Sequence, residues 1–395
     1  MNVSNGDCAG WPAERTDGRP REGGKELFRY YKGSLLFTAV CLGVAAWLGS
    51  HLTGSLSGTL GVLWIVLVLG VLEVSLSFDN AVVNATVLRD MDPVWQRRFL
   101  TWGIVIAVFG MRIVFPLLVV AIAAKLGPID AVRLAATDPV TYERIITGAH
   151  VGISGFGGSF LAMVGLTFFL DDDKDSHWIG PIERPFSGLG RISGAAIAVV
   201  LLALFGISRL IAPGDAMTFI TSGMFGLVSY IAVGAIGTLL EKEEGEPSGQ
   251  AATVTVAKAG LGAFLYLEVL DASFSFDGVI GAFALSNNLF VIALGLGIGA
   301  MFVRSMTVML VDRGTLTEYP YLEHGAFYAI IALAAIMLLS VRFEIPETVT
   351  GLIGAGFIGL AFIASVRSNR ARDGHEAIPL EDASPIGPTG EHLSL

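Results

Sequence analysis

Cysteine, histidine and charge are all scarce in this sequence. Only two cysteines occur among 395 residues, Cys8 in a polar leader and Cys41 in the first apolar segment, which argues against a disulfide framework. Charged residues make up 15%, the net charge is −10 and the basic residues are scattered, so the basic patch that binds nucleic acid is lacking. Neither a His-Glu-x-x-His signature nor a pair of catalytic histidines is found. We therefore expect no enzyme, no prosthetic group and no nucleic-acid partner.

Apolar residues are abundant instead. They make up 53% of the chain, and the mean hydropathy of +0.68 lies outside the range of soluble proteins. The 49 glycines fit a membrane protein, because small residues let helices approach closely in lipid. The composition predicts an all-α, polytopic membrane protein whose surface contacts the lipid bilayer.

Ten stretches are long enough to cross a bilayer, at about 20 apolar residues per crossing. They are 34–52, 59–88, 99–125, 149–170, 193–212, 217–240, 256–287, 289–311, 325–343 and 347–366. Lysine and arginine are more frequent in the loops that lie on the same side of the membrane as the amino terminus. We therefore expect both termini to lie in the cytoplasm and the protein to lie in an inner or plasma membrane.

The chain divides into four parts on this basis. Residues 1–32 and 367–395 are polar and are expected to be disordered cytoplasmic ends. Residues 33–212 form a first membrane repeat and residues 213–366 a second one. The second repeat would be inverted, because its motif segment starts from the opposite side of the membrane.

Two segments carry acids inside apolar sequence, Leu72–Asn84 and Leu267–Ile280. Both follow the pattern acid-x-Ser-x-Ser-Phe-Asp, and they align when Asp79 is placed on Asp277. The copies are predicted to run antiparallel in a five-plus-five inverted repeat, an arrangement in which transporters bind substrate between the repeats.

The correspondence continues beyond the motifs. Arg112 in the third predicted span matches Arg304 in the eighth, and both are candidates for balancing charge or gating. His150 and His324 also correspond, but each lies at the start of a span, and the sequence leaves open whether they take part.

Within the first motif, two acids cannot share one face of a regular helix. Glu73, Ser77, Asn80 and Asn84 fall within about 60° of each other at 100° per residue, whereas Asp79 falls elsewhere. In the second motif Glu268, Asp271 and Ser275 share a face, whereas Asp277 falls elsewhere. Either each motif helix is surrounded by protein on two sides, or it is interrupted near the motif so that the carboxylates converge. We expect the interruption, because serine, asparagine and glycine gather there.

The acids need compensation. Each costs about 2.5–3.5 kcal/mol at the centre of a spanning helix, so the five motif acids would together cost roughly 12–17 kcal/mol if uncompensated. Two arginines cannot neutralise five carboxylates, which indicates a bound divalent cation, or protons in its absence. The donors are hard oxygens, which suit Mn²⁺, Ca²⁺ or Mg²⁺. The candidate ligands are Glu73, Asp79, Asn80, Glu268, Asp271 and Asp277, with Ser77, Asn84 and Ser275 as secondary polar lining.

The two motifs resemble those of the TerC family of membrane proteins. Leu72-Glu73-x5-Asp79-Asn80 is similar to the first family motif, and Glu268-x2-Asp271-x2-Phe274-x2-Asp277 to the second. Gly278 departs from the family, which usually has serine there, and the extra spans indicate a divergent branch. The resemblance implies a cation exporter, with Mn²⁺ as its first candidate and a link to tellurite resistance.

The predicted function is export of a divalent cation, Mn²⁺ before Ca²⁺ or Mg²⁺, in exchange for protons. Glu268 would be an additional ligand or a proton carrier, and crowded carboxylates would take up protons when the cation leaves. Two alternatives stay open: an intramembrane metal-dependent enzyme, and a non-transporting scaffold linked to metal or tellurite stress. Ion identity, direction, coupling and oligomeric state, including a homo-oligomer, are not fixed by the sequence.

Overall fold

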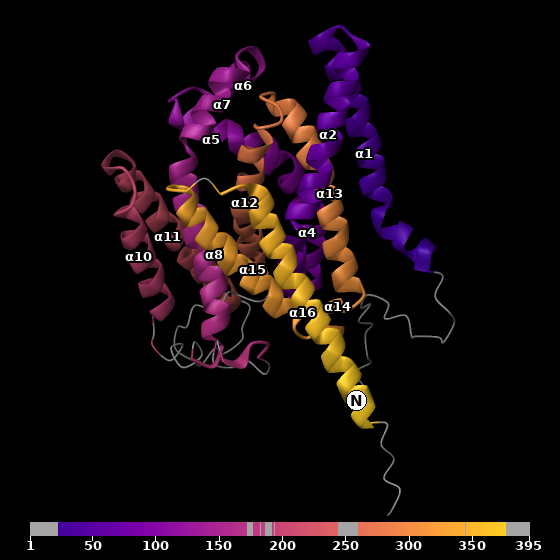
Figure 1. The fold of residues 1–395 in the computed structure, drawn as a ribbon, viewed down its shortest axis with the longest axis vertical. Coiled ribbons are helices and arrows are strands. Elements are labelled where there is room, and N and C mark those ends of the chain that lie inside the picture. The colour runs from indigo at the N-terminus through magenta and orange to yellow at the C-terminus, as the bar shows by residue number, and fades with distance from the viewer. Residues whose placement is uncertain are drawn as a thin grey trace, which may run out of the picture.

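The computed structural model describes residues 23–171, 177–181, 183–185, 192, 194–243, 260–343 and 345–376, and within these ranges every regular element is a helix (Figure 1). The first half contains α1 (Gly23–Thr53), α2 (Leu56–Leu76), α3 (Phe78–Arg89), α4 (Pro93–Val105), the π-helix η1 (Ile106–Val114), α5 (Phe115–Ala123), α6 (Pro128–Thr137), α7 (Pro139–Gly148), α8 (His150–Leu170) and α10 (Ala195–Ser208). The second half contains α11 (Pro213–Glu243), α12 (Leu261–Ala282), α13 (Leu289–Asp312), α14 (Thr315–Glu318), α15 (Leu322–Ser340) and α16 (Glu347–Glu376).

Eight helical segments of the described chain are long and apolar enough to cross a membrane. They are Leu27–Thr53, Leu56–Leu76, Pro93–Ala123, His150–Leu170, Pro213–Gly237, Leu289–Asp312, Leu322–Ser340 and Thr348–Ala371. The prediction of a polytopic, all-helical membrane protein is therefore confirmed. Of the other two predicted spans, one corresponds to α10, which has only 14 residues, and one to α12, which carries the acids of the second motif. The count of ten crossings stays a prediction, as does the five-plus-five repeat.

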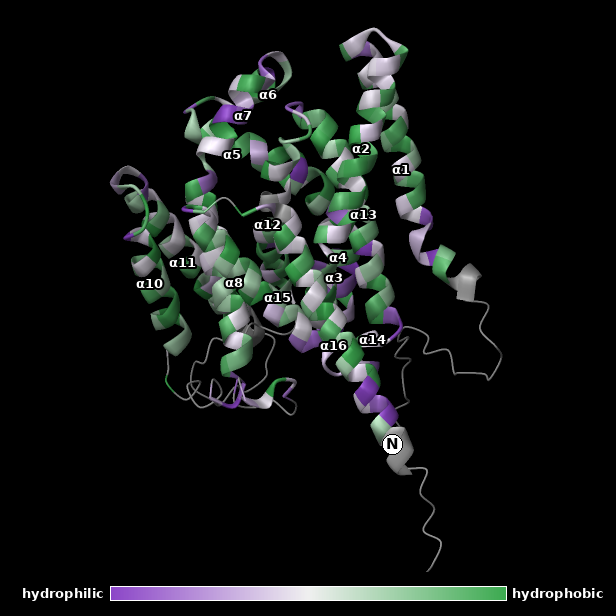
Figure 2. Cartoon of the chain, viewed as in Figure 1, coloured by the Kyte–Doolittle hydropathy of each residue, from purple (hydrophilic) through white to green (hydrophobic). Residues whose placement is uncertain are grey.

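The helix ends follow local sequence signals. Ser55 caps α2 by accepting a hydrogen bond from the Gly58 N–H, and Asn288 caps α13 by accepting from the N–H groups of Phe290 and Val291. Asp92 caps α4 and is followed by Pro93, a residue suited to the first helical position. Green, hydrophobic residues dominate the long helices in Figure 2, and purple residues gather at the lower part of α16.

The outermost helices extend beyond their predicted spans. α1 begins at Gly23 and α16 continues to Glu376, whereas disorder was expected up to residue 32 and from residue 367. Lys, Arg and Glu are good helix formers, so polar sequence can continue a helix past the apolar stretch. Residues 1–22 and 377–395 lie outside the described residues, and the predicted boundary between two repeats at residue 212 remains a prediction.

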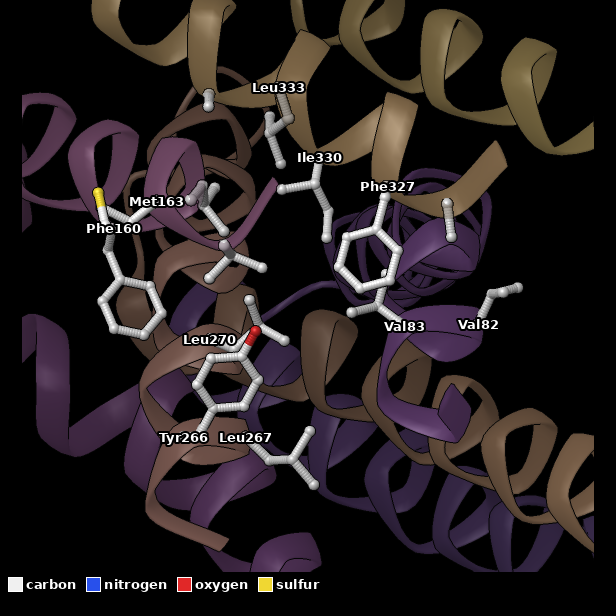
Figure 3. Close-up of a cluster of buried hydrophobic side chains, with 14 of the residues drawn as sticks. Val82, Val83, Phe160, Met163, Tyr266, Leu267, Leu270, Phe327, Ile330 and Leu333 are labelled. Carbon is white, nitrogen blue, oxygen red and sulfur yellow. The ribbon is translucent and has the colours of Figure 1, made fainter. Parts of the chain in front are cut away.

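A cluster of buried apolar side chains packs several helices of the bundle together (Figure 3). Figure 3 shows side chains from α3, α8, α12 and α15 pointing toward one another, and they include Val82, Val83, Phe160, Met163, Leu267, Leu270, Phe327 and Ile330. Both motif segments contribute to this cluster through residues that alternate with their polar ones. The cluster therefore fixes the position of α3 against α12, which is where the polar residues of the two motifs meet.

Candidate functional site

The first motif lies on an interrupted helix. Ser77 ends α2 and precedes α3, with φ −102° and ψ 20°, outside the α-helical region. Beside it, the Asp79 carboxylate accepts a hydrogen bond from the backbone N–H of Asn80 at 2.9 Å, which satisfies an N–H group in the first turn of α3. The predicted interruption is thus present in this motif, and it separates Glu73 in α2 from Asp79 in α3.

The second motif does not share this feature. The sequence predicts an interruption there too, and that prediction is wrong, because α12 is one helix from Leu261 to Ala282. The hydroxyl of Ser273 donates to the carbonyl of Val269 at 2.9 Å, four residues earlier, and so follows the direction of the helical bonds. Only one of the two motif segments therefore contains a bend.

The two motifs lie against each other and run antiparallel. The Nδ2 of Asn80 donates to Oδ1 of Asp271 at 2.6 Å, and a Cβ atom on Gly278 would lie 3.2 Å from Oε2 of Glu73. As numbering rises from Glu73 to Asn80, it falls from Gly278 to Asp271. Gly278 therefore leaves room for the Glu73 carboxylate, which a side chain at this position would contact tightly.

Glu73 is buried in an ion pair with Arg112. The Nη2 of Arg112 donates to Oε1 of Glu73, which also accepts from the hydroxyl of Ser77 at 3.1 Å. Both charged side chains are almost completely buried, at 5% and 4% exposed. Arg112 lies on the π-helix η1, and its Nε and Nη1 lack hydrogen-bond partners among the described residues. π-Helical segments are rare and are frequently found at functional sites.

Arg304 holds the corresponding position beside the second motif. Its guanidinium carbon lies 3.5 Å from the ring centroid of Phe99, and it interacts electrostatically with Asp271 and Glu268. A Cβ atom on Gly103 would be 2.7 Å from Nη2 of Arg304 and 2.9 Å from Oε1 of Glu268, so the glycine makes room for both groups. Each motif is therefore accompanied by one buried arginine.

Two small cavities adjoin these residues. The one beside the start of α16 is called the upper cavity, and the one beside the last part of α13 is called the lower cavity. The upper cavity, of about 50 Å³, is lined by Glu73, Leu76, Ser77, Asp79, Phe274, Gly278, Leu333, Thr350 and Gly351. The lower cavity, of about 20 Å³, is lined by Glu73, Ser77, Asn80, Asn84, Ala107, Arg112, Asp271, Ala300, Val303, Arg304 and Thr307. Each is large enough for a water molecule or a small ion. Most of the predicted site residues therefore border an internal polar space.

The surroundings of three predicted residues, one of which lines the upper cavity, differ from one another. Oδ2 of Asp79 would be 3.1 Å from a Cβ atom on Gly354 of α16, so this acid packs against a helix outside both motifs. Ser275 is buried, and its hydroxyl has no hydrogen-bond partner among the described residues. The side chain of Asp277 lies outside the described part of the structure, although its backbone belongs to α12.

No three His, Cys, Asp or Glu side chains converge as a metal-binding group within the described residues. Three of the motif acids, Glu73, Asp79 and Asp271, line the cavities, and the lining of the lower cavity also includes both arginines. The predicted ligand set stays a prediction, and this arrangement is one in which protein cations balance the acids.

The two histidines lie away from both cavities. Nε2 of His150 lies 3.1 Å from the hydroxyl of Ser154, and Nε2 of His324 lies 3.6 Å from a carboxylate oxygen of Glu183. Neither is among the residues that line the cavities. The correspondence between them in sequence therefore does not extend to a shared site.

Comparison with known protein families identifies one family that matches most of the chain. Residues 78–372 match the family described as "Protein of unknown function (DUF475)", which is a membrane protein family. The chain belongs to the DUF475 family. The match includes Asp79, Asn80, the whole second motif and both arginines, and it begins just after Glu73 and Ser77. Searches of curated proteins and of solved structures found no match.

Three residues of this DUF475 protein at the site were missed by sequence reasoning. Thr307 lies one turn after Arg304 on α13, and that spacing could have indicated it. Thr350 lies in α16, and Phe99 lies in α4, outside both motifs. For these two the sequence offers no signal, because a single threonine or phenylalanine in an apolar stretch is ordinary.

Close packing of Glu73 gives a first prediction. A Cβ atom on Gly299 would overlap the side chain of Glu73 and lie 2.9 Å from the Gly70 carbonyl oxygen, whereas one on Gly297 would meet only ordinary contacts from 3.5 Å outward. We expect Gly299→Ala to lower the free energy of unfolding by about 1–3 kcal/mol through overpacking. Gly297→Ala is the matched control and should lower it by clearly less. Unfolding of the purified variants in detergent measures the difference, and equal effects would contradict the packing described.

Proposed function

We propose that this DUF475 protein is a membrane transporter that exports a divalent cation in exchange for protons. The observation that carries the proposal is the contact between the two acidic motifs, made by the hydrogen bond from Asn80 to Asp271 beside two buried arginines. Ionisable residues inside a membrane are rare and line ion or proton pathways. Here they border cavities in a chain whose described part contains eight helices long and apolar enough to cross a bilayer.

The two arginines suggest how the negative charge of the carboxylates is compensated when no cation is bound. Arg112 pairs with Glu73, and Arg304 lies close enough to Asp271 and Glu268 to act on their charges. A divalent cation that entered among these carboxylates would take over the compensation, and the arginines would be displaced. Protons would share the compensation when the cation leaves, which couples the two flows.

Mn²⁺ is the cation that we propose first. The donors near the cavities are carboxylate, carboxamide and hydroxyl oxygens, which suit Mn²⁺, Ca²⁺ and Mg²⁺ better than soft metals. The resemblance of both motifs to the TerC family supports Mn²⁺ among the three and supports export as the direction. The proposed setting is an inner or plasma membrane, with both termini in the cytoplasm.

Transport by purified protein tests the proposal. In proteoliposomes with a pH gradient, we expect flux of Mn²⁺ and a smaller flux of Ca²⁺ or Mg²⁺, measured with a metal-sensitive dye inside the vesicles. Asp79→Asn should lower the Mn²⁺ flux at least about tenfold, because one site carboxylate is lost. The matched control is Asp130→Asn, which changes an acid whose side chain is 60% exposed on α6.

Two results would contradict it. One is an absence of divalent-cation flux for the intact protein, which would favour a scaffold or an enzyme. The other is Asp79→Asn protein that transports as fast as Asp130→Asn protein. Loss of coupling to the pH gradient alone would remove proton exchange from the proposal but leave cation transport.

A further inference from the structure

The two cavities follow one another along the bundle. The upper cavity is lined by Phe274 and Gly278 in the last part of α12, and by Thr350 and Gly351 in the first turn of α16. These residues are near the end of the bundle at which α12 turns into α13. The lower cavity is lined by Asn84 in the second half of α3 and by Thr307 near the end of α13, toward α14. Figure 1 shows α14 near the lower end of the bundle, opposite α6.

Among the described residues, Glu73 and Ser77 alone line both cavities. They are joined to each other by a hydrogen bond of 3.1 Å and to the wall of the lower cavity by the ion pair of Glu73 with Arg112. The glutamate has little room to move sideways, because Gly278 and Gly299 approach it so closely that a Cβ atom on either would be tight or would overlap it. Glu73 and Ser77 thus lie in the wall that the two cavities share, and Arg112 lies beside them on the side of the lower cavity.

We propose that Glu73, Ser77 and Arg112 form a single gate that separates an upper cavity open to one side of the membrane from a lower cavity open to the other. This inference rests on the proposed transport function and adds its regulation. The three residues are called the bridge below. Opening requires that Arg112 leave Glu73, and a cation or proton arriving at the carboxylate supplies the replacement charge.

The local backbone provides a way for the bridge to open. Arg112 is carried by η1, and Glu73 and Ser77 lie at the interruption between α2 and α3. A π-helix has wider turns than an α-helix, and a shift by one residue toward α-helical bonding rotates a side chain by about 100°. Such a shift would move the guanidinium away from the carboxylate without unfolding the span.

Thiol labelling from each side of the membrane tests the gate and does not require transport. In a background with Cys8→Ser and Cys41→Ala, one variant carries Thr350→Cys in the upper cavity and another carries Thr307→Cys in the lower cavity. The probe is Ag⁺, a membrane-impermeant, thiol-reactive ion small enough for cavities that hold a water molecule, applied to sealed right-side-out or inside-out vesicles. The labelled fraction is the loss of thiols that a maleimide dye can modify after denaturation. We expect Thr350→Cys protein to react from the outer face only, and Thr307→Cys protein from the cytoplasmic face only.

Weakening the bridge should abolish this sidedness. When Glu73→Gln is added, labelling from the formerly closed face should rise at least about tenfold at both positions. Ser77→Ala, which removes one hydroxyl, should give a smaller rise in the same direction and serves if Glu73→Gln protein does not fold. Glu143→Gln on α7, outside both cavities, is the matched control and should leave the labelling rates unchanged.

Labelling of both positions from the same face in the unaltered bridge would overturn the gate, as would protection that persists in both bridge variants. One-sided labelling that the bridge variants abolish, in a protein that moves no divalent cation in proteoliposomes, would support the gate and reject the proposed cargo. The two proposals can therefore fail separately.

Discussion

Replacing Arg112 by methionine is expected to lower the free energy of unfolding by about 3–5 kcal/mol, because it leaves the Glu73 carboxylate buried without a partner cation. The side chains of both residues are at most 5% exposed, so bulk solvent cannot hydrate the carboxylate as it hydrates an acid at the surface. The measurement is unfolding of the purified protein in detergent. Arg133→Met is the matched control, since Arg133 faces Asp130 at 3.9 Å with both side chains largely exposed. It should cost less than about 1 kcal/mol.

A double-mutant cycle separates the pair from its surroundings. In Glu73→Gln/Arg112→Met protein no charge is left unpaired, so much of the stability lost in Arg112→Met should return. Free energies that simply add would show that Glu73 and Arg112 do not interact, in conflict with the buried pair. An Arg112→Met cost no larger than that of Arg133→Met would have the same meaning.

The second large effect is expected at Phe99, which is buried beneath the Arg304 guanidinium. Phe99→Ala should lower the free energy of unfolding by about 3–5 kcal/mol through the lost volume. Phe99→Leu keeps most of that volume but removes the aromatic face, so its cost should include a cation–π contribution of about 2 kcal/mol.

The matched control for this prediction is Phe160→Leu. Phe160 is equally buried and contacts the aromatic rings of Tyr230 and Tyr266. Phe99→Leu should therefore cost more than Phe160→Leu, and the excess should disappear when both are measured in an Arg304→Met background. An excess that persists there would show that Phe99 contributes by packing alone.

Much of the site could be predicted because the two motifs repeat. The shared pattern of acids around Asp79 and Asp277 indicated that two distant segments meet, and the bond from Asn80 to Asp271 joins them. The antiparallel course of the two motifs also agrees with the sequence. Apolar stretches gave the helices, since such long runs have few other stable forms in a membrane.

Other features depend on contacts that no local pattern encodes. The sequence indicated two arginines for several acids, but only packing assigns Arg112 to Glu73 and places Arg304 over Phe99. The π-helical stretch around Arg112 has no residue signature. The interruption was predicted in both motifs because polar residues such as serine gather in both. Ser273, however, donates to a backbone carbonyl of its own helix, whereas Ser77 donates to the carboxylate of Glu73.

The interruption at Ser77 also creates two facing helix ends inside the bundle. Peptide dipoles leave partial positive charge at the start of α3 and partial negative charge at the end of α2. Asp79 lies in the first turn of α3, where that field favours a carboxylate by about 0.3–1 kcal/mol, and Glu73 lies in the last turn of α2, where the field opposes one. The ionised form of Asp79 is thus stabilised by the helix dipole, whereas the ionised form of Glu73 requires a nearby cation. This difference accounts for the location of the guanidinium beside Glu73, while Asp79 is accompanied by backbone N–H groups.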